Sequence, residues 1–159
     1  MVIIGVDPGK KGGIAVIGEN KEIISLTPMP LIGGKTIDAN ALANLFEVAD
    51  SVMYIEKVNA MPKQGVVSMF NFGFGCGLIE GIAAAFSIPY YKITPQTWMK
   101  IMHRGCDGKL DTKSRSIQVV KRQFPNLSLL ATPRSKKDHD GMAEALLIAL
   151  YGLGQERPE

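Results

Sequence analysis

The stretch Ile4-Gly5-Val6-Asp7-Pro8-Gly9 decides how the fold is interpreted, because it joins an apolar run to an acid and a turn. Residues 2–6 are apolar, and a second apolar run at 12–18 follows the Pro–Gly turn. Two such runs around a short turn predict a β-hairpin. A third run at 22–26 extends the hairpin to a three-stranded antiparallel meander.

The rest of the chain alternates between helical and extended patterns. Helices are expected at 36–49, at 66–86, from Thr94-Pro95 onward, at 113–124 and at 141–153, and further strands at 51–56 and 89–93. A meander followed by alternating helices and strands is typical of an α/β fold with a mixed sheet. We therefore predict a mixed five-stranded sheet, made of the meander plus parallel strands and flanked by helices.

Length and composition favour one domain. The chain has 159 residues, of which 46% are hydrophobic, enough for one core but not for two. We expect a single domain at 1–154 and a flexible tail at 155–159. No apolar run approaches the roughly 18 to 20 residues that span a bilayer, and the first residues lack the basic leader of a signal peptide. We expect no membrane association.

The cysteines indicate the redox environment. Cys76 and Cys106 show neither pairing nor metal-site spacing. Free thiols in a reducing compartment are the simpler interpretation. We therefore expect a cytoplasmic protein.

Positive charge is concentrated in one segment. The net charge is only +3, yet residues 92–137 contain eleven Lys or Arg against two acids. A basic segment on an otherwise acidic chain indicates a polyanionic partner, with an ordinary solvated surface as the alternative.

Acids stand where two apolar strands end. Asp7 follows the first strand, and Glu56 ends the strand at 51–56. If these strands are parallel neighbours, their C-terminal ends meet, and sites in open α/β sheets usually lie there. Taken singly, each acid could be an ordinary turn or solvated strand-end residue.

A second pair of acids stands at the start of the last helix. Asp140 and Glu144 are four residues apart and share one helix face, directly before the apolar run 145–150. In a buried setting their repulsion is costly unless a cation is present or a proton is taken up. Four carboxylates suit hard divalent cations such as Mg²⁺ or Mn²⁺. Two such ions, about 3.5 to 4 Å apart, would activate water and stabilise the leaving oxygen in phosphodiester hydrolysis.

Three motifs together resemble the RuvC-type Holliday junction resolvases of the RNase H-like nuclease superfamily. They are Ile4-Gly5-Val6-Asp7-Pro8-Gly9 with its Gly-rich continuation, Ile55-Glu56-Lys57-Val58, and KDHDGMAEALL at 137–147. Their order and spacing cover nearly the whole chain. The compact length is most similar to the bacteriophage branch of the family.

The resemblance implies an RNase H-like fold and a metal-dependent endonuclease that cuts two opposed strands of a four-way DNA junction symmetrically. It also implies a homodimer, in the cytoplasm of a bacterial or phage-infected host cell. The catalytic metal ligands carried over from the family are Asp7, Glu56, Asp140 and Glu144.

The sequence departs from the family pattern in two places. Many members space the last two acids three residues apart, whereas here the spacing is four. Asp138 and His139 therefore remain alternatives to Asp140 as the partner of Glu144. Some members also carry a wedging aromatic just after the second acid, where this chain has Asn59-Ala60-Met61. Candidates for opening the junction are Met61, Phe70 and Phe72, or nothing comparable.

The residues expected to contact DNA fall on both sides of the acids. The segment 57–71 should line the junction, and a longer basic track is expected on the helix at 113–124. The nucleic-acid-binding candidates are Lys10, Lys11, Lys57, Lys63, Gln64, Ser68, Lys113, Arg115, Lys121, Arg122, Lys136 and Lys137. Trp98 is expected to be a packing residue, since one tryptophan does not make a stacking platform. Glycines 73, 77 and 81 would line one helix face and permit close packing.

Three other functions compete with junction resolution. A related RNase H-like nuclease acting on branched, flap or fork DNA or on RNA/DNA hybrids would share the chemistry and differ only in its binding surface. A junction-binding protein without catalysis would have no reason to keep a cluster of acids beside the DNA backbone. An actin-like ATPase also opens with an acid before a Gly-rich hairpin, but it needs two such halves, for which 159 residues are too few.

Overall fold

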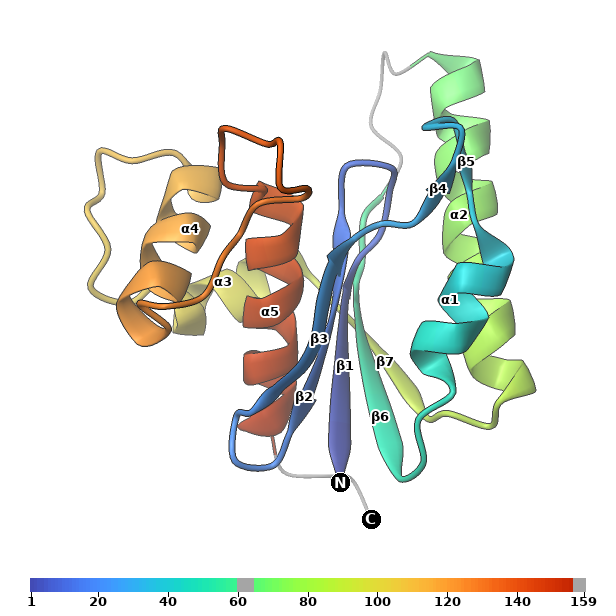
Figure 1. Cartoon of the computed structure of the whole chain (residues 1–159), viewed down its shortest axis with the longest axis horizontal. Helices are drawn as coiled ribbons and strands as arrows, with labels where there is room; N and C mark the ends of the chain where they lie inside the picture. The colour runs from blue at the N-terminus through green and yellow to red at the C-terminus, as the bar shows by residue number, and fades with distance from the viewer. Residues whose placement is uncertain (60–64, 156–159) are drawn as a thin grey trace.

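A computed structural model describes residues 1–59 and 65–155. Five strands form one mixed sheet in the order β3-β2-β1-β6-β7 (Figure 1). Their bounds are β1 Val2–Asp7, β2 Gly13–Gly18, β3 Ile23–Pro28, β6 Ser51–Glu56 and β7 Tyr90–Ile93. β1 pairs antiparallel with β2, and β2 with β3, whereas β6 is parallel to both β1 and β7. The predicted meander plus parallel strands is confirmed.

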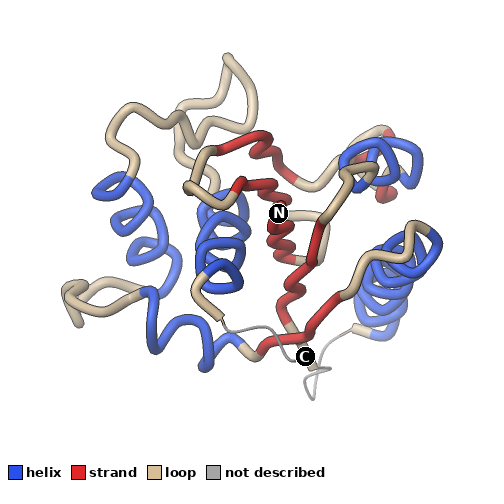
Figure 2. Tube along the Cα trace, turned by 90° about the horizontal axis from the view of Figure 1, so that it is seen from below, coloured by secondary structure: helices blue, strands red, loops and turns tan. Residues whose placement is uncertain are grey.

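Helices cover both faces of the sheet (Figures 1 and 2). On one face, α5 (Asp140–Leu153) packs against β1 and β2, with α3 (Pro95–Met102) and α4 (Thr112–Gln123) outside it. On the other face lie α1 (Ala39–Phe46) and α2 (Val66–Ala85). Each face buries its own apolar cluster, so the sheet is covered on both sides as the parallel strand pairs require.

The central helix α5 lies unusually close to β1. A Cβ on Gly5 of β1 would lie 2.2 Å from the carbonyl oxygen of Ala145, so only glycine lets the helix backbone approach this strand. Every residue of α5 from Gly141 to Gly152 is buried. The apolar run predicted from the sequence is therefore the centre of the core on this face.

The expected helix at 36–49 is wrong at both ends. Thr36–Ile37 forms a short strand, β5, which pairs with β4 (Leu31–Ile32) in a separate two-stranded sheet. Asp38 then caps α1, because its carboxylate accepts from the backbone N–H groups of Asn40 and Ala41. Periodicity alone could not separate the two short strands from the helix that follows them.

Polar side chains also cap the first turns of α3 and α4. Thr94 caps α3, its hydroxyl accepting from the N–H of Thr97 at 3.3 Å, and Asp111 caps α4 through the N–H of Ser114 at 2.9 Å. Cys76 and Cys106 are free thiols, as expected. The tail expected at 155–159 lies outside the described residues except for Gln155.

The helix α2 is apolar and largely exposed. Within the described part of the chain it alone is long and apolar enough to cross a membrane, judged by its length and composition. The expectation that no apolar run reaches this length is wrong, because Gly and Ala residues extend the run and Glu80 is its single charge. One such helix, judged by length and composition, is weak evidence for a membrane span.

Candidate metal centre

Two strands and one helix bring four acids to the same edge of the sheet, the upper edge in Figure 1. The parallel register pairs Val6 with Ile55, so Asp7 and Glu56 come next to each other at the ends of β1 and β6. The start of α5 reaches this edge because its backbone lies against the β1–β2 turn. A Cβ on Gly141 would be 2.3 Å from the carbonyl oxygen of Lys11. Glycine is needed there for the first turn of α5 to stand beside Asp7.

The four acids act on one another electrostatically. Burial raises the pKa of Asp7 well above its ordinary value, and the charges of Glu56, Glu144 and Asp140 raise it further. Burial, followed by repulsion from Glu56 and Asp140, raises the pKa of Glu144 to about 7. The direct interaction between the side chains of Asp7 and Glu144 raises the pKa of Asp7 further and lowers the pKa of Glu144. The cluster therefore holds more negative charge than its surroundings stabilise.

The geometry separates the three alternatives for the partner of Glu144. Asp138 forms an ion pair with Lys121 at 2.5 Å, directed at α4. His139 caps α5, its Nδ1 accepting from the N–H of Met142 at 3.1 Å. Asp140 pairs with Lys113 at 2.5 Å, and its charge raises the pKa of both Asp7 and Glu144. Asp140 is thus the residue of the three that the structure couples to the other acids.

Comparison with known proteins bears on the fold. No family model matches the sequence, and no curated protein matches it. Among solved structures, T. thermophilus RuvC in complex with a Holliday junction substrate is similar to this chain, with a TM-score of 0.60 and 16% identity over 95% of this chain and 91% of that one. A second Thermus thermophilus RuvC structure gives a TM-score of 0.58 and 16% identity, over 95% and 92%. The fold is RNase H-like, of the RuvC type. At this identity the likeness is one of fold alone.

The acid cluster fits a hard divalent cation in its chemistry. Its donors are carboxylate oxygens, which Mg²⁺ and Mn²⁺ prefer, and a cation would offset the burial and repulsion that raise the pKa of Asp7 and Glu144. Within the described residues, however, no three acidic, histidine or cysteine side chains stand close enough together to hold a metal ion as they are. To bind a metal ion, the carboxylate side chains of Glu56 and Asp140 must therefore move closer to Asp7 and Glu144.

Sequence reasoning missed a contact to Glu56. The indole Nε1 of Trp98 donates to Oε1 of Glu56 at 2.9 Å. Burial raises the pKa of Glu56, and this hydrogen bond opposes the rise. Only the order of the strands could have indicated this contact. β7 pairs with the end of β6, where Glu56 lies opposite Ile93. Because α3 begins directly after β7, its first turns lie beside Glu56.

Several of the candidate DNA-contacting side chains already have partners within the chain. Lys113 and Lys121 are held in ion pairs with Asp140 and Asp138. The guanidinium of Arg115 on α4 donates to the carbonyl oxygen of Gly108 at 2.8 Å, which holds the side chain against the loop that precedes the helix. The other exposed candidates are Lys10, Lys11, Lys57, Ser68, Arg122, Lys136 and Lys137. Lys63 and Gln64, like Met61, lie outside the described residues.

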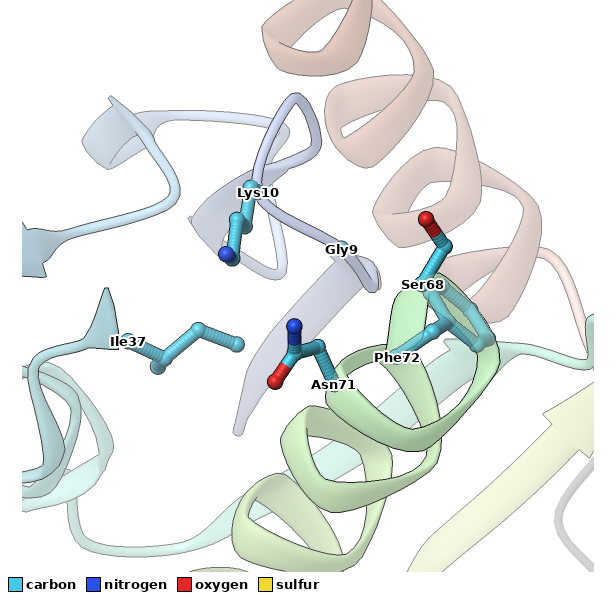
Figure 3. A pocket seen from close by; sticks show the side chains of 6 residues that line it. All are labelled: Gly9, Lys10, Ile37, Ser68, Asn71 and Phe72. Atoms are coloured by element: carbon cyan, nitrogen blue, oxygen red, sulfur yellow. The ribbon is translucent and has the colours of Figure 1, made fainter. Parts of the chain in front are cut away.

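A cavity of about 190 Å³ opens beside the turn that follows Asp7 (Figure 3). It lies between the turn that follows Asp7 and the first turns of α2. Lys10 reaches into it from the turn and Asn71 from the helix (Figure 3). The full lining is Gly9, Lys10, Ile37, Ser68, Asn71 and Phe72. The ring of Phe72 packs next to Gly9, where an added Cβ would be 3.3 Å away. Of the wedge candidates, Phe72 is thus part of this wall, whereas Phe70 is 73% exposed.

Proposed function

We propose that this chain is a divalent-metal-dependent endonuclease that cuts four-way DNA junctions at paired, symmetric positions as a homodimer. The observation that carries the proposal is the convergence of Asp7, Glu56, Asp140 and Glu144 at one edge of a RuvC-type fold. The T. thermophilus RuvC of similar fold was solved with a Holliday junction substrate. Exposed lysines surround the same edge, so a phosphate backbone could approach the acids.

The four acids are assigned as metal ligands and as the catalytic residues. When bound, two divalent ions would activate a water and stabilise the oxygen that leaves in phosphodiester hydrolysis. The chain's own contribution is to hold the carboxylates together against their repulsion. Asp7 and Glu144 form the inner pair, while the outer acids have partners of their own: Asp140 pairs with Lys113, and Glu56 accepts from Trp98.

DNA contacts are proposed on both sides of the acids. Lys10 and Lys11 lie in the turn after Asp7, and Lys57 directly follows Glu56; all three are exposed. Each phosphate that such a lysine neutralises releases counterions, so junction affinity should fall steeply with salt concentration. Lys136 and Lys137, exposed ahead of α5, extend this basic surface past the helix start.

The second copy is proposed to bind the outer face of α2. This face is made of the exposed residues Val66, Phe70, Gly73, Phe74, Gly77, Gly81 and Ala84. Val66 is 83% exposed, Phe70 73% and Phe74 58%, and such side chains together expose on the order of 400 Å² of apolar surface. That is about half of what each partner contributes to a standard interface. Glu80, the one charged residue of α2, is already paired with Lys92 at 2.7 Å, so burial of this face would leave no unpaired charge on the helix.

Side-chain size along this face favours a two-fold pairing. Its first half carries the large side chains, and its second half is Gly77, Gly81 and Ala84. Cβ atoms added at Gly73, Gly77 and Gly81 would have no described atom within 4 Å, so nothing within the chain requires these glycines. An antiparallel pair of α2 helices would place the large half of one against the small half of the other, as an isologous interface needs.

Light scattering tests this surface. Wild type should have twice the mass of one chain, and Phe70→Asp should have the mass of one chain. Ile24→Asp, which adds the same charge at a 53% exposed position on β3, serves as the matched control and should leave the dimer intact. A monomeric wild type, or equal dimerisation of Phe70→Asp, would remove the homodimer from the proposal.

The substrate proposal is tested by a panel of labelled DNAs. Four-way junction, 5′ flap, replication fork, linear duplex and RNA/DNA hybrid are each incubated with the protein and Mg²⁺ or Mn²⁺. Faster cleavage of the four-way junction, abolished by EDTA and in Asp7→Asn, is expected. Equal or faster cleavage of flaps, forks or hybrids would replace junction resolution by the related nuclease activity. Junction binding without cleavage by wild type would refute catalysis.

A further inference from the structure

The single tryptophan of the chain lies in contact with the acid cluster rather than only in the core. Trp98 is fully buried, and its Nε1 lies 2.9 Å from Oε1 of Glu56, a residue 42 positions earlier in the chain. We propose that Trp98 is a positioning residue that orients the Glu56 carboxylate for a divalent cation. This inference rests on the proposed metal centre.

The chemistry of the indole makes this contact directional. Indole N–H donates and cannot accept, and when buried it needs an acceptor. Glu56 supplies that acceptor with one oxygen, which fixes the orientation of the carboxylate and leaves its second oxygen available to a cation. Outer hydrogen bonds of this kind orient metal ligands in many proteins.

Further contacts hold the indole ring in place. The ring of His103 stands edge-on to it, with centroids 5.4 Å apart and an interplanar angle of 80°. Nε2 of His103 lies 3.0 Å from the Ser116 hydroxyl, which itself donates to the carbonyl oxygen of Thr112 at 3.1 Å. Since that hydroxyl proton is already used, Nε2 must be the donor to Ser116. The ring of Trp98 is therefore braced by α4, and it cannot turn away from Glu56 without breaking this chain of contacts.

The same two helices orient both outer acids. α3 provides Trp98 for Glu56, and α4 provides Lys113 for Asp140. A packing role alone would require only the volume of the ring, which phenylalanine largely supplies. The positioning role requires the N–H group, and this difference makes the two roles separable.

The first experiment uses wild-type protein. Because Trp98 is the only tryptophan, its fluorescence reports on the Glu56 contact. Titration with Mg²⁺ or Mn²⁺ should give a saturable change in emission that follows the binding isotherm from calorimetry. Glu56→Gln keeps the indole in place and should abolish the change. Cation binding in the calorimeter with unchanged emission would overturn the inference alone, whereas no cation binding at all would overturn the proposed metal centre with it.

The second experiment compares Trp98→Phe with Val119→Ala, a substitution at a fully buried position of α4 in the same apolar cluster as Trp98. Calorimetry should show about a 10- to 100-fold loss of cation affinity in Trp98→Phe and none in Val119→Ala. Junction affinity in EDTA should be unchanged in both variants. Cleavage by Trp98→Phe should recover toward the wild-type rate as the cation concentration is raised. Unchanged or tighter cation binding by folded Trp98→Phe would overturn the positioning role.

Discussion

Removing the charge of Glu144 should stabilise the protein above neutral pH in the absence of metal. Its pKa is raised from 4.5 to about 7, chiefly by burial. An acid whose pKa is raised on folding costs no stability below pH 4.5, and the cost grows until the pH passes about 7. At 1.36 kcal/mol per unit, the cost at pH 8 is at most about 3 kcal/mol, and solvent screening at this edge of the sheet lowers it to about 2 kcal/mol.

The assay is urea unfolding of wild type and Glu144→Gln in EDTA at pH 5, 6, 7 and 8. The stability of the variant relative to wild type should increase by about 2 kcal/mol between pH 5 and pH 8, because glutamine has no charge to desolvate. Glu47→Gln, an exposed glutamate at the end of α1, is the matched control and should show no such increase. If the difference between Glu144→Gln and wild type were the same at pH 5 and pH 8, the electrostatic account of the acid cluster would be wrong.

Three other changes have defined outcomes. Gly141→Ala should lower the free energy of urea unfolding by about 1 to 3 kcal/mol, because its Cβ would lie 2.3 Å from the Lys11 carbonyl oxygen; Gly108→Ala, with nothing within 4 Å, should change it by less than about 0.5 kcal/mol. Mg²⁺ at 100 times its Kd should stabilise wild type by about 2.7 kcal/mol in thermal unfolding at pH 8. The same addition should leave Asp7→Asn unchanged, and equal stabilisation of both would refute the assigned site. Lys121→Met should cost no more than about 1 kcal/mol in urea unfolding, because its ion pair with Asp138 is half-exposed.

Much of the sheet could be predicted from the sequence because its signals are local. The apolar runs on either side of the Asp7 turn, and the acid at the end of β6, were sufficient to predict a meander joined to a parallel strand. The Thr94-Pro95 signal for the start of α3 was equally local. The β4–β5 hairpin was missed because two-residue strands have no measurable period.

The candidate site was harder to predict because its details depend on side chains from distant segments. Spacing placed Asp140 and Glu144 on one helix face, but it could not exclude Asp138 or His139. In the structure Asp138 is instead paired with Lys121 of α4, and His139 caps α5. Trp98 looked like a packing residue for the same reason, since its Nε1 contact joins residues 42 positions apart.

Paired cutting is tested most directly with a supercoiled plasmid that carries an extruded cruciform, incubated with the protein and Mg²⁺. Two symmetric cuts within one encounter convert the circle to linear DNA with ends that ligase can seal, whereas single cuts give nicked circles. Wild type should give linear product, and Asp7→Asn should give none. Mixed dimers of the two chains should give nicked circles. Nicked circles alone from wild type, or linear product from Asp7→Asn, would contradict the assignment of this acid cluster as the active site of a dimeric junction endonuclease.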